Sequence, residues 1–264
     1  MKYFDTHSHL NLTQFRDDYR EVISVLEEKE VGAITVGVDE DSSAKAIEIS
    51  GMSEHLYASV GLHPTEIDRE TFDPGFYAKF MDNKKVVCVG ECGLDYFRIN
   101  TSDAGIKERQ EAQFRAQIEF AIEYDKPLML HIRPSKNSFD AYEETLKILS
   151  EYNASAGDKL RGNAHFFAGN LEIAKQFIAL GFYISFTGVI TFTHDYDEVV
   201  KGIPLDRMLS ETDAPYVAPV PYRGQRCEPW HVISVAEKLS ELRGVPLGDM
   251  ESQLLENTKR LFDI

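Results

Sequence analysis

Short apolar runs alternate with longer amphipathic stretches along the whole chain. Several of the runs are apolar at every position, which is typical of parallel strands buried on both faces. Each run is followed by polar residues or glycine and then by a stretch with helical spacing. We therefore predict eight strands, at Tyr3–Asp5, Gly32–Val38, Leu56–Val60, Val86–Gly90, Leu128–Ile132, Gly162–Phe166, Phe182–Phe186 and Arg207–Glu211.

The stretches between these runs carry apolar residues on one face of a helix. In the first of them Val22, Val25 and Leu26 fall on one side, as expected for a helix that packs on a sheet. Asn170 and Asp249 are predicted helix N-caps, and Gly181 lies where a helix is expected to end. The predicted helices are Asp18–Lys29, Glu108–Tyr124, Phe139–Ser150, Leu171–Leu180, Val232–Leu242 and Asp249–Leu261.

Eight strand–helix alternations without a compositional break predict an α/β fold, a single (β/α)₈ TIM barrel over residues 1–264. The length is close to the roughly 250 residues of such a barrel. An open doubly wound sheet is the alternative, but its glycine-rich phosphate loop is missing after the first strand, where Thr6-His7-Ser8-His9 stands instead. The irregular stretch Val217–Pro229 follows the last strand, at the face where barrels carry their active sites.

The charge balance restricts the partners that the protein can bind. The formal net charge is −16, from 28 Lys and Arg against 44 Asp and Glu, and such a surface repels nucleic acid and anionic membranes at long range. A phosphate substrate would need local cations to overcome that field. The three cysteines, Cys88, Cys92 and Cys227, form no CxxC pair, which favours a reducing compartment. With a short polar N-terminus and no membrane-length apolar run, we expect a cytoplasmic protein without membrane association.

The strongest local signal is the pair His7 and His9 at the end of the first strand. Residues two apart on a strand point to the same side, about 7 Å apart along the chain. Two neutral imidazoles at that spacing can bind one divalent cation. In isolation, two surface histidines in a polar turn would explain the pair equally well.

Four further residues stand at the ends of other strands. Glu91 ends the fourth, His131 the fifth and His165 the sixth, and Asp213 follows the eighth. A lone histidine or carboxylate at such a position is more often structural, but a closed barrel brings all these strand ends to one mouth. Six candidate ligands are too many for one catalytic zinc and suit two metal ions that share a bridging ligand.

These residues stand in motifs that resemble those of the TatD-related deoxyribonucleases, a family of the amidohydrolase superfamily. The resemblance runs from the first strand to Asn257-Thr258. The segments that carry it are Asp5-Thr6-His7-Ser8-His9-Leu10, Gly61-Leu62-His63-Pro64, Gly90-Glu91-Cys92-Gly93-Leu94-Asp95-Tyr96, His131, His165, Glu211-Thr212-Asp213-Ala214-Pro215-Tyr216 and Arg223-Gly224.

The resemblance implies a role for each candidate ligand. His7, His9 and Asp213 would hold one metal ion, His131 and His165 would hold the other, and Glu91 would bridge the two. His63 looks like the family's substrate-side histidine, beside the metal ions. Four imidazoles suit Zn²⁺ or Mn²⁺, while the resemblance to nucleases suggests that Mg²⁺ can serve.

The predicted chemistry is hydrolysis by a water molecule that the two metal ions activate. Asp213 or Glu91 would accept the proton of the water, and His63 would orient a phosphate or protonate the leaving oxygen. Substrate contacts are predicted from loops on the same face. Arg133 and Arg223, with Lys136 and Arg226, would contact phosphates, and Tyr96 and Phe97 would stack on an unpaired base.

Three functions compete on this sequence. The first is a deoxyribonuclease that acts as an exonuclease on the end of a single DNA strand, or on another small phosphodiester. The second is a metal-dependent amidase, lactonase or deacylase, because the same type of site hydrolyses C–N and C–O bonds in sister families. The third, a catalytically idle scaffold, is the weakest, since all six ligand positions carry competent side chains. The oligomeric state and the polarity of digestion stay open.

Overall fold

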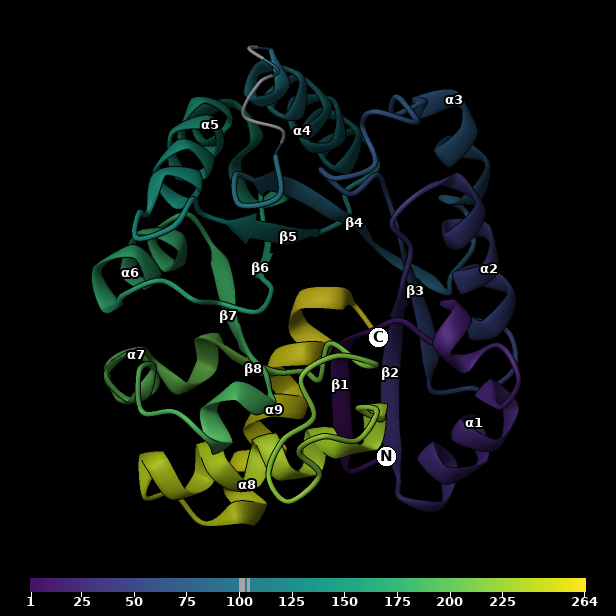
Figure 1. The fold of residues 1–264 in the computed structure, drawn as a ribbon, viewed down its shortest axis with the longest axis vertical. Helices are drawn as coiled ribbons and strands as arrows, with labels where there is room; N and C mark the ends of the chain where they lie inside the picture. Colours follow the sequence, from purple (N-terminus) through teal and green to yellow (C-terminus); the bar gives the residue numbers. More distant parts are fainter. Residues whose placement is uncertain (100–102, 104) are drawn as a thin grey trace.

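The structure is a computed structural model that describes residues 1–99, 103 and 105–264. Its strands form one eight-stranded parallel sheet in chain order, which Figure 1 shows as an inner ring surrounded by helices. The predicted (β/α)₈ TIM barrel is thereby confirmed. The strands are β1 (Tyr3–Ser8), β2 (Val31–Val36), β3 (Leu56–Val60), β4 (Val86–Asp95), β5 (Leu128–Arg133), β6 (Gly162–Ala164), β7 (Phe182–Phe186) and β8 (Met208–Ser210).

The barrel closes between its first strand and the segment after its last one. Ser8 and Ala214 form a parallel bridge. The backbone N–H of His9 donates to the carbonyl of Ala214 at 2.8 Å, and that of Asp213 donates to the carbonyl of His7 at 2.9 Å. The closure therefore fixes three candidate metal ligands, His7, His9 and Asp213, relative to one another through backbone hydrogen bonds.

Nine α-helices are found among the described residues, and all six predicted ones are present. The three that the apolar pattern did not predict are α2, α3 and α7. Helix α2 turns small residues, Ser43, Ala46 and Ser50, into the core, so its apolar face is faint in the sequence. The helices are α1 (Tyr19–Glu28), α2 (Glu40–Ser50), α3 (Pro74–Tyr77), α4 (Ile106–Glu123), α5 (Asp140–Ala156), α6 (Leu171–Ala179), α7 (Asp197–Gly202), α8 (Val232–Arg243) and α9 (Leu247–Phe262).

Two of the three predicted helix boundaries are confirmed. The side chain of Asn170 accepts a hydrogen bond from the N–H of Ile173 and caps α6, and Gly181 follows that helix with a φ of 90°. The N-cap prediction for Asp249 is wrong. Helix α9 starts two residues earlier, directly after Pro246. The N–H groups of Asp249 and Met250 both donate to the carbonyl of Pro246, so Asp249 already lies inside the first turn.

The interior of the barrel is filled by apolar side chains from six of its strands. Helix α9 contacts β1 and β8, and its last turn adds two residues to this interior cluster. One end of the barrel is therefore closed by packing, and the candidate ligands lie at the other. The cluster contains Phe4, Ile34, Val87, Met129, Tyr183 and Leu209 from the strands, and Leu261 and Phe262 from α9.

The helices of this barrel pack on the sheet with one face and meet solvent with the other. Helix α4, with 18 residues, buries Phe114, Ile118 and Ala121 against the core and carries charged residues along its remaining faces. None of the described helices combines the length and the apolarity that crossing a bilayer requires.

Candidate active site

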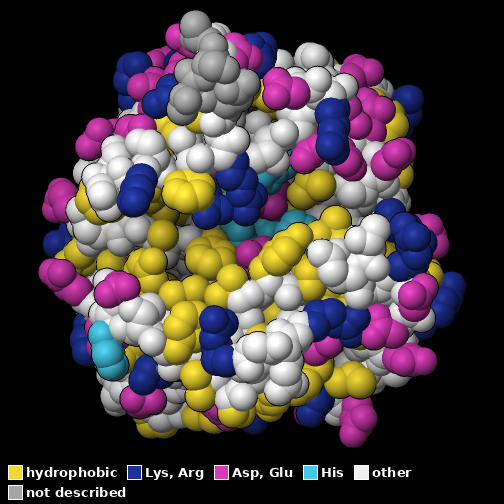
Figure 2. All heavy atoms as spheres, in the orientation of Figure 1, with side chains coloured by type: hydrophobic (Ala, Val, Ile, Leu, Met, Phe, Trp, Pro, Cys, Tyr) yellow, Lys and Arg dark blue, Asp and Glu magenta, His cyan; other side chains and the backbone are white. Residues whose placement is uncertain are grey.

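All six predicted ligands meet at the barrel mouth. Glu91 does not end its strand as predicted, because β4 continues past it to Asp95. His7 lies in β1 and His9 directly after it, Glu91 in β4, His131 in β5, His165 after β6 and Asp213 after β8. In Figure 2 a hollow opens at the centre of this face, with histidine and acidic side chains on its floor and Lys and Arg side chains along one edge. The hollow is a cavity of about 780 Å³.

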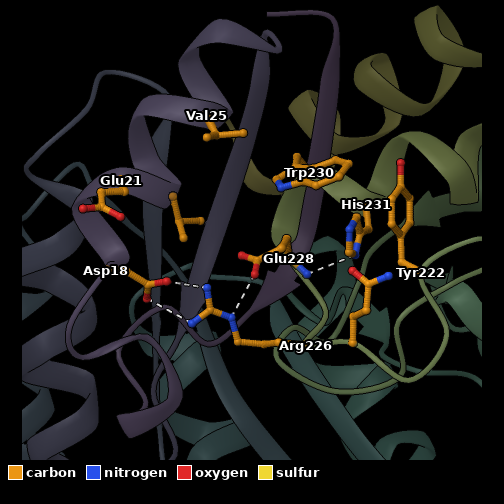
Figure 3. A pocket seen from close by; sticks show the side chains of 10 residues that line it. Asp18, Glu21, Val25, Tyr222, Arg226, Glu228, Trp230 and His231 are labelled. Carbon is orange, nitrogen blue, oxygen red and sulfur yellow. Dashed lines mark hydrogen bonds and ion pairs between the residues drawn. The ribbon is translucent and has the colours of Figure 1, made fainter.

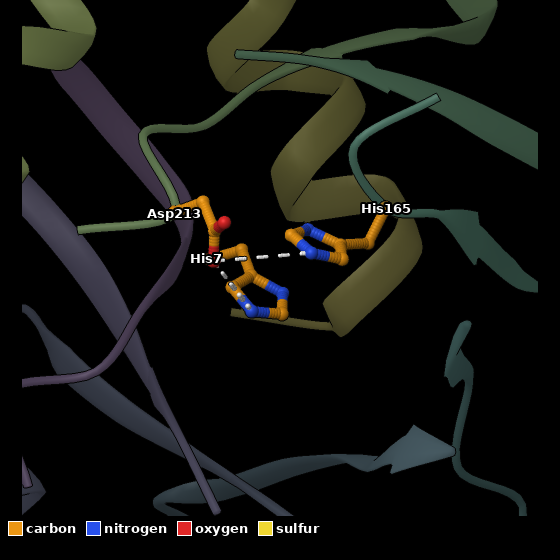
Figure 4. A group of neighbouring side chains, drawn as sticks. All are labelled: His7, His165 and Asp213. Atoms are coloured by element: carbon orange, nitrogen blue, oxygen red, sulfur yellow. Dashed lines mark ion pairs between the residues drawn. The ribbon is translucent and has the colours of Figure 1, made fainter. Parts of the chain in front are cut away.

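Histidines from β1 and Asp213 form the first half of the site. The Nε2 atoms of His7 and His9 are 3.1 Å apart, and the Oδ1 atom of Asp213 lies 3.7 Å from the first and 3.6 Å from the second. Figure 4 shows that one oxygen of Asp213, Oδ1, forms the ion pairs with both His7 and His165. Three donor atoms thus surround one point.

Glu91 stands between two groups of histidines. Its Oε2 atom lies 3.4 Å from Nε2 of His7 and 3.7 Å from Nε2 of His9. Its Oε1 atom lies 2.7 Å from Nδ1 of His131 and 3.6 Å from Nε2 of His165. Each oxygen therefore faces its own group, which is the arrangement expected of a carboxylate that bridges two cations.

The donor set fits divalent metal ions. Three groups have ligand atoms within 4.8 Å of one another: His7, His165 and Asp213; His7, His9 and Glu91; and His63, Glu91 and His131. Because His7 and Glu91 belong to two groups each, the groups are adjacent. Imidazole nitrogens with a shared carboxylate suit Zn²⁺ or Mn²⁺.

Two glycines beside Glu91 allow β4 to approach β5 closely. A Cβ atom on Gly90 would lie 2.4 Å from the carbonyl oxygen of Met129, and one on Gly93 would lie 2.2 Å from that of His131. The pairing of β4 with β5 shifts register between Val89 and Cys92. Only glycine fits such contacts, so these residues set the position at which the Glu91 carboxylate enters the barrel mouth.

The electrostatics of the site keep its carboxylates ionised. Burial alone would raise the pKa of Glu91, but the neighbouring His7 and His63 outweigh burial and hold that pKa well below its usual value. The pKa of Asp213 is also lowered, because His9 and His165 outweigh its burial. Ionised carboxylates with all their lone pairs are ready to bind a cation.

The sequence model of the family described as TatD related DNase matches residues 4–263. The chain belongs to this family. A Bacillus subtilis relative named metal-dependent hydrolase YabD is 39% identical over 99% of both chains. The Escherichia coli K12 metal-dependent hydrolase YcfH is 31% identical over 98% of this chain and 95% of its own length.

Solved structures agree with this assignment. The crystal structure of YjjV, a TatD homolog from Escherichia coli K12, superposes with a TM-score of 0.88 over 100% of this chain and 98% of its own, at 28% identity. An organophosphorus hydrolase from Deinococcus radiodurans shares the fold, with a TM-score of 0.62 at 13% identity over 98% of this chain and 92% of its own. The protein is therefore a metal-dependent hydrolase of the TatD family.

A second layer of polar groups orients the ligands of this TatD-family site. Nδ1 of His9 lies 3.0 Å from the carbonyl oxygen of Val36, so this nitrogen carries the proton and Nε2 is free to bind metal. Nδ1 of His165 lies 2.9 Å from Oε1 of Glu211. Glu211 was not predicted as a site residue, although it stands in the same motif as Asp213. Hydrogen bonding to the far nitrogen is how metal-binding histidines are usually held.

His63 lies beside the ligands but carries a proton where a ligand needs a lone pair. Its Nδ1 atom accepts a hydrogen bond from the backbone N–H of Thr65 at 3.1 Å. The proton of the neutral ring is therefore on Nε2, which lies 3.6 Å from Oε1 of Glu91. Burial and the neighbouring His131 lower the pKa of His63 to about 3. His63 is thus a neutral hydrogen-bond donor.

Two arginines line the cavity, and only one of them was predicted. Arg133 stacks over the ring of Phe97 at 4.3 Å, and Arg98 lies on the same wall. Phe97 is 53% exposed, so part of its surface is open to solvent. Arg98 belongs to no recognised motif. Only its position in the loop after the fourth strand could have indicated that it lies at the cavity.

Two predicted substrate contacts lie elsewhere. Arg223 donates to the carbonyl of Ala218 at 2.7 Å and stacks on Phe192 at 3.9 Å, and it does not line the cavity. Tyr96 is only 5% exposed, and Lys107 lies 3.8 Å above its ring. Tyr96 therefore offers no open ring face to a base. In both cases tertiary packing in the loop, which the sequence does not reveal, decides the direction of the side chain.

A second cavity, of about 510 Å³, lies between α1 and the loop after β8. Figure 3 shows Arg226 in this cavity, paired with Asp18 and Glu228. The distances are 2.6 Å to Oδ2 of Asp18 and 2.8 Å to Oε1 of Glu228. The guanidinium of Arg226 thus ties the loop to α1, and it does not line the metal-side cavity.

His231, next to this ion pair, predicts a pH dependence of stability. Its Nδ1 accepts the N–H of Glu228 at 3.1 Å, so protonation there breaks a hydrogen bond. Burial and Lys29 lower its pKa to about 4 from an ordinary 6.5. Its stabilising contribution is complete above pH 6.5 and is lost as the pH falls toward 4.

We expect the titration of His231 to lower the free energy of unfolding by about 2 kcal/mol when the pH falls from 7 to 5. Urea unfolding of the wild type and of His231→Gln at both pH values measures the effect. The fall in unfolding free energy should be smaller in the variant by that amount. Equal falls in the two proteins would assign the dependence to other groups.

Proposed function

We propose that this TatD-family hydrolase cleaves phosphodiester bonds of DNA, as an exonuclease at the end of a single strand, with two divalent ions, Zn²⁺, Mg²⁺ or Mn²⁺. The observation that carries the proposal is Glu91, whose two oxygens face separate groups of histidines beside a cavity wall with Arg98 and Arg133. The three free, buried cysteines are compatible with the cytoplasm as its proposed location.

In this proposal the ligands divide as the family resemblance implies. His7, His9 and Asp213 would hold one ion, His131 and His165 would hold the other, and Glu91 would bridge them. When bound, such a pair of ions activates water and neutralises charge on a phosphoryl group. The protein supplies the fixed positions of the ligands, which the backbone closure between β1 and β8 and the glycines of β4 support.

Asp213 is the better candidate for the proton acceptor. Both oxygens of Glu91 lie within 3.4 Å of a histidine nitrogen, so neither is free. The ion pairs of Asp213 with His7, His9 and His165 are all formed by Oδ1, so Oδ2 pairs with none of these histidines. The Asp213 carboxylate also lines the cavity. A base needs an oxygen that reaches the water proton while the other oxygen stays bound.

His63 would bind a phosphate oxygen of the substrate. His63 lines the cavity, and its Nε2 lies 3.6 Å from Oε1 of Glu91, which is too long for a hydrogen bond. The N–H of Thr65 fixes the proton at this nitrogen. A neutral imidazole donates a hydrogen bond well but is too weak an acid to protonate a leaving oxygen efficiently. Of the two roles considered for His63, we therefore propose orientation of the phosphate.

Arg98 and Arg133 would form the local cationic surface that a protein of net charge −16 needs to bind DNA. Both guanidinium groups lie on the wall toward the loop after β4. Phe97 would offer part of its ring to an unpaired base, a contact worth roughly 1–3 kcal/mol per base. A narrow cationic mouth on an acidic surface favours a strand end over a duplex.

We expect Arg133→Ala to raise the KM for single-stranded DNA by about tenfold, because a charge-assisted contact to phosphate contributes about 1.5 kcal/mol. Metal content should not change. Arg223→Ala is the matched control, because Arg223 packs on Phe192 instead of lining the cavity. We expect its KM to change less than twofold. Steady-state kinetics on a labelled oligonucleotide measure both variants, and a larger effect in Arg223→Ala would contradict the assignment.

The experiment that tests the proposed function compares substrate classes. The metal-loaded protein is incubated with end-labelled single-stranded DNA and with a panel of lactones and acylamides, each with and without chelator. Loss of terminal nucleotides that chelator abolishes supports the exonuclease. Chelator-sensitive turnover of a lactone or acylamide, with DNA left intact, would replace it by the amidase, lactonase or deacylase alternative.

A further inference from the structure

We infer that Asp95 is a positioning residue that holds the proton of His131 on Nε2 and so keeps Nδ1 open for a metal ion. This inference rests on the proposed metal centre but not on its substrate. Asp95 is the last residue of β4 and is fully buried.

The inference starts from the position of His131 between two carboxylates. Nδ1 of His131 lies 2.7 Å from Oε1 of Glu91, and Nε2 lies 3.0 Å from Oδ2 of Asp95. Nδ1 of His9 is hydrogen-bonded to the carbonyl oxygen of Val36, and Nδ1 of His165 lies 2.9 Å from the carboxylate of Glu211. Both rings present Nε2 to the site. His131 is the reverse case. The nitrogen that faces the other ligands is Nδ1, so a metal ion can bind His131 there only when the proton sits on Nε2, on the side of Asp95.

Asp95 can serve only as an acceptor in this position. Its Oδ1 accepts two backbone N–H groups, from Phe97 at 3.0 Å and from Arg98 at 2.8 Å. Gln110 of α4 hydrogen-bonds the backbone N–H and C=O of Asp95 at 2.9 and 3.1 Å. The carboxylate is thus fixed by groups that do not belong to the metal site.

The variant Asp95→Asn should reverse the proton on His131. An asparagine has one acceptor oxygen and one NH₂ group. Two backbone N–H groups compete with one imidazole for that oxygen, so the oxygen stays on the side of Phe97 and Arg98. The NH₂ group then faces Nε2 of His131, which must accept. The imidazole proton moves to Nδ1, between the ring and Glu91, and blocks the lone pair that a cation would use.

Glu211→Gln is the matched control. Oε1 of Glu211 accepts the N–H of Phe166 at 2.5 Å and lies 2.9 Å from Nδ1 of His165. Its Oε2 has no hydrogen-bond partner among the described residues. A glutamine can keep its oxygen toward both donors and place its NH₂ where Oε2 stands. This variant removes a buried charge behind a metal ligand without reversing the ligand's proton.

The test measures metal stoichiometry and the proton position separately. Wild type, Asp95→Asn and Glu211→Gln are loaded with Zn²⁺, dialysed and analysed for zinc per chain. Long-range ¹H–¹⁵N NMR on protein with labelled histidines then locates the proton of each ring, with and without zinc. Thermal unfolding of the metal-free variants shows whether each one folds.

We expect two zinc ions in the wild type and a loss of about 100-fold or more in affinity for one of them in Asp95→Asn. We expect the His131 proton on Nδ1 in metal-free Asp95→Asn, and on Nε2 in the zinc-loaded wild type. Glu211→Gln should retain both ions with a loss of roughly tenfold or less.

The inference is overturned if Asp95→Asn keeps both ions, if its His131 proton is on Nε2, or if Glu211→Gln loses as much affinity. If Asp95→Asn does not fold, the NMR of the zinc-loaded wild type tests the inference by itself. Zinc bound to Nε2 of His131 would then refute it. A wild type that binds fewer than two ions would instead contradict the proposed dinuclear centre. The NMR of metal-free Asp95→Asn then still tests Asp95 by itself.

Discussion

Replacing Glu91 by glutamine should lower kcat/KM by about 10³-fold or more and should release at least one of the two metal ions. Glu91 is the residue whose two oxygens serve both groups of histidines, at 3.4 Å from Nε2 of His7 and at 2.7 Å from Nδ1 of His131. The neutral amide has one acceptor oxygen, so one group loses its partner. A catalytic metal ion lowers the activation barrier by several kcal/mol, and losing that stabilisation corresponds to the expected fall in kcat/KM.

Elemental analysis and single-turnover kinetics measure the two effects of Glu91→Gln on the same preparation. Glu66→Gln is the matched control, because Glu66 lines the same cavity but pairs with Arg69 at 3.1 Å. We expect the control to bind both ions and to turn over within about twofold of the wild type, as is usual for a carboxylate paired with an exposed cation at the surface. Full metal content together with full activity in Glu91→Gln would remove the bridging role.

The second large effect is expected from Asp213→Asn, with a fall in kcat of about 10²- to 10⁴-fold. The amide retains an oxygen for the point between His7 and His9, where Oδ1 lies 3.7 and 3.6 Å from their Nε2 atoms. It cannot accept a proton, however. Because a missing base slows the chemical step more than substrate binding, KM should change far less than kcat.

Kinetics at saturating metal ion separate the loss of a base from the loss of a ligand. If Asp213 acts mainly as a ligand, raising the metal concentration restores the kcat of Asp213→Asn. If Asp213 acts as the base, extra metal does not restore kcat. Asp206→Asn, in the turn before β8 at the other end of that strand, is the control for substituting an aspartate. A kcat within threefold of the wild type in Asp213→Asn would leave Glu91 as the proton acceptor.

The strand ends were predictable because two local rules agree at each of them. Continuous apolar runs mark strands buried on both faces, and the residue that ends such a run in a barrel lies at the mouth. His131 ends the run Leu128–Leu130, and His165 follows Ala164. The family motifs added the division of ligands between two ions. These features depend on chain order and on strand periodicity, which the sequence contains directly.

The side chains around the ligands were predicted less well. Arg223 and Tyr96 were expected at the substrate, but Phe192 and Lys107, both distant in the sequence, determine where they point. Arg98 was missed for the same reason. A loop side chain has several rotamers of similar energy, so its direction depends on neighbours from other elements.

The sequence by itself determined the barrel, the order of its strands and the six candidate ligands at their ends. The tertiary structure alone decided which nitrogen of each histidine is free to bind metal, since that depends on partners across the barrel such as Val36 for His9 and Glu211 for His165. Periodicity places a residue on a face of the sheet. The position of a proton depends on hydrogen bonds that form only when distant segments pack together.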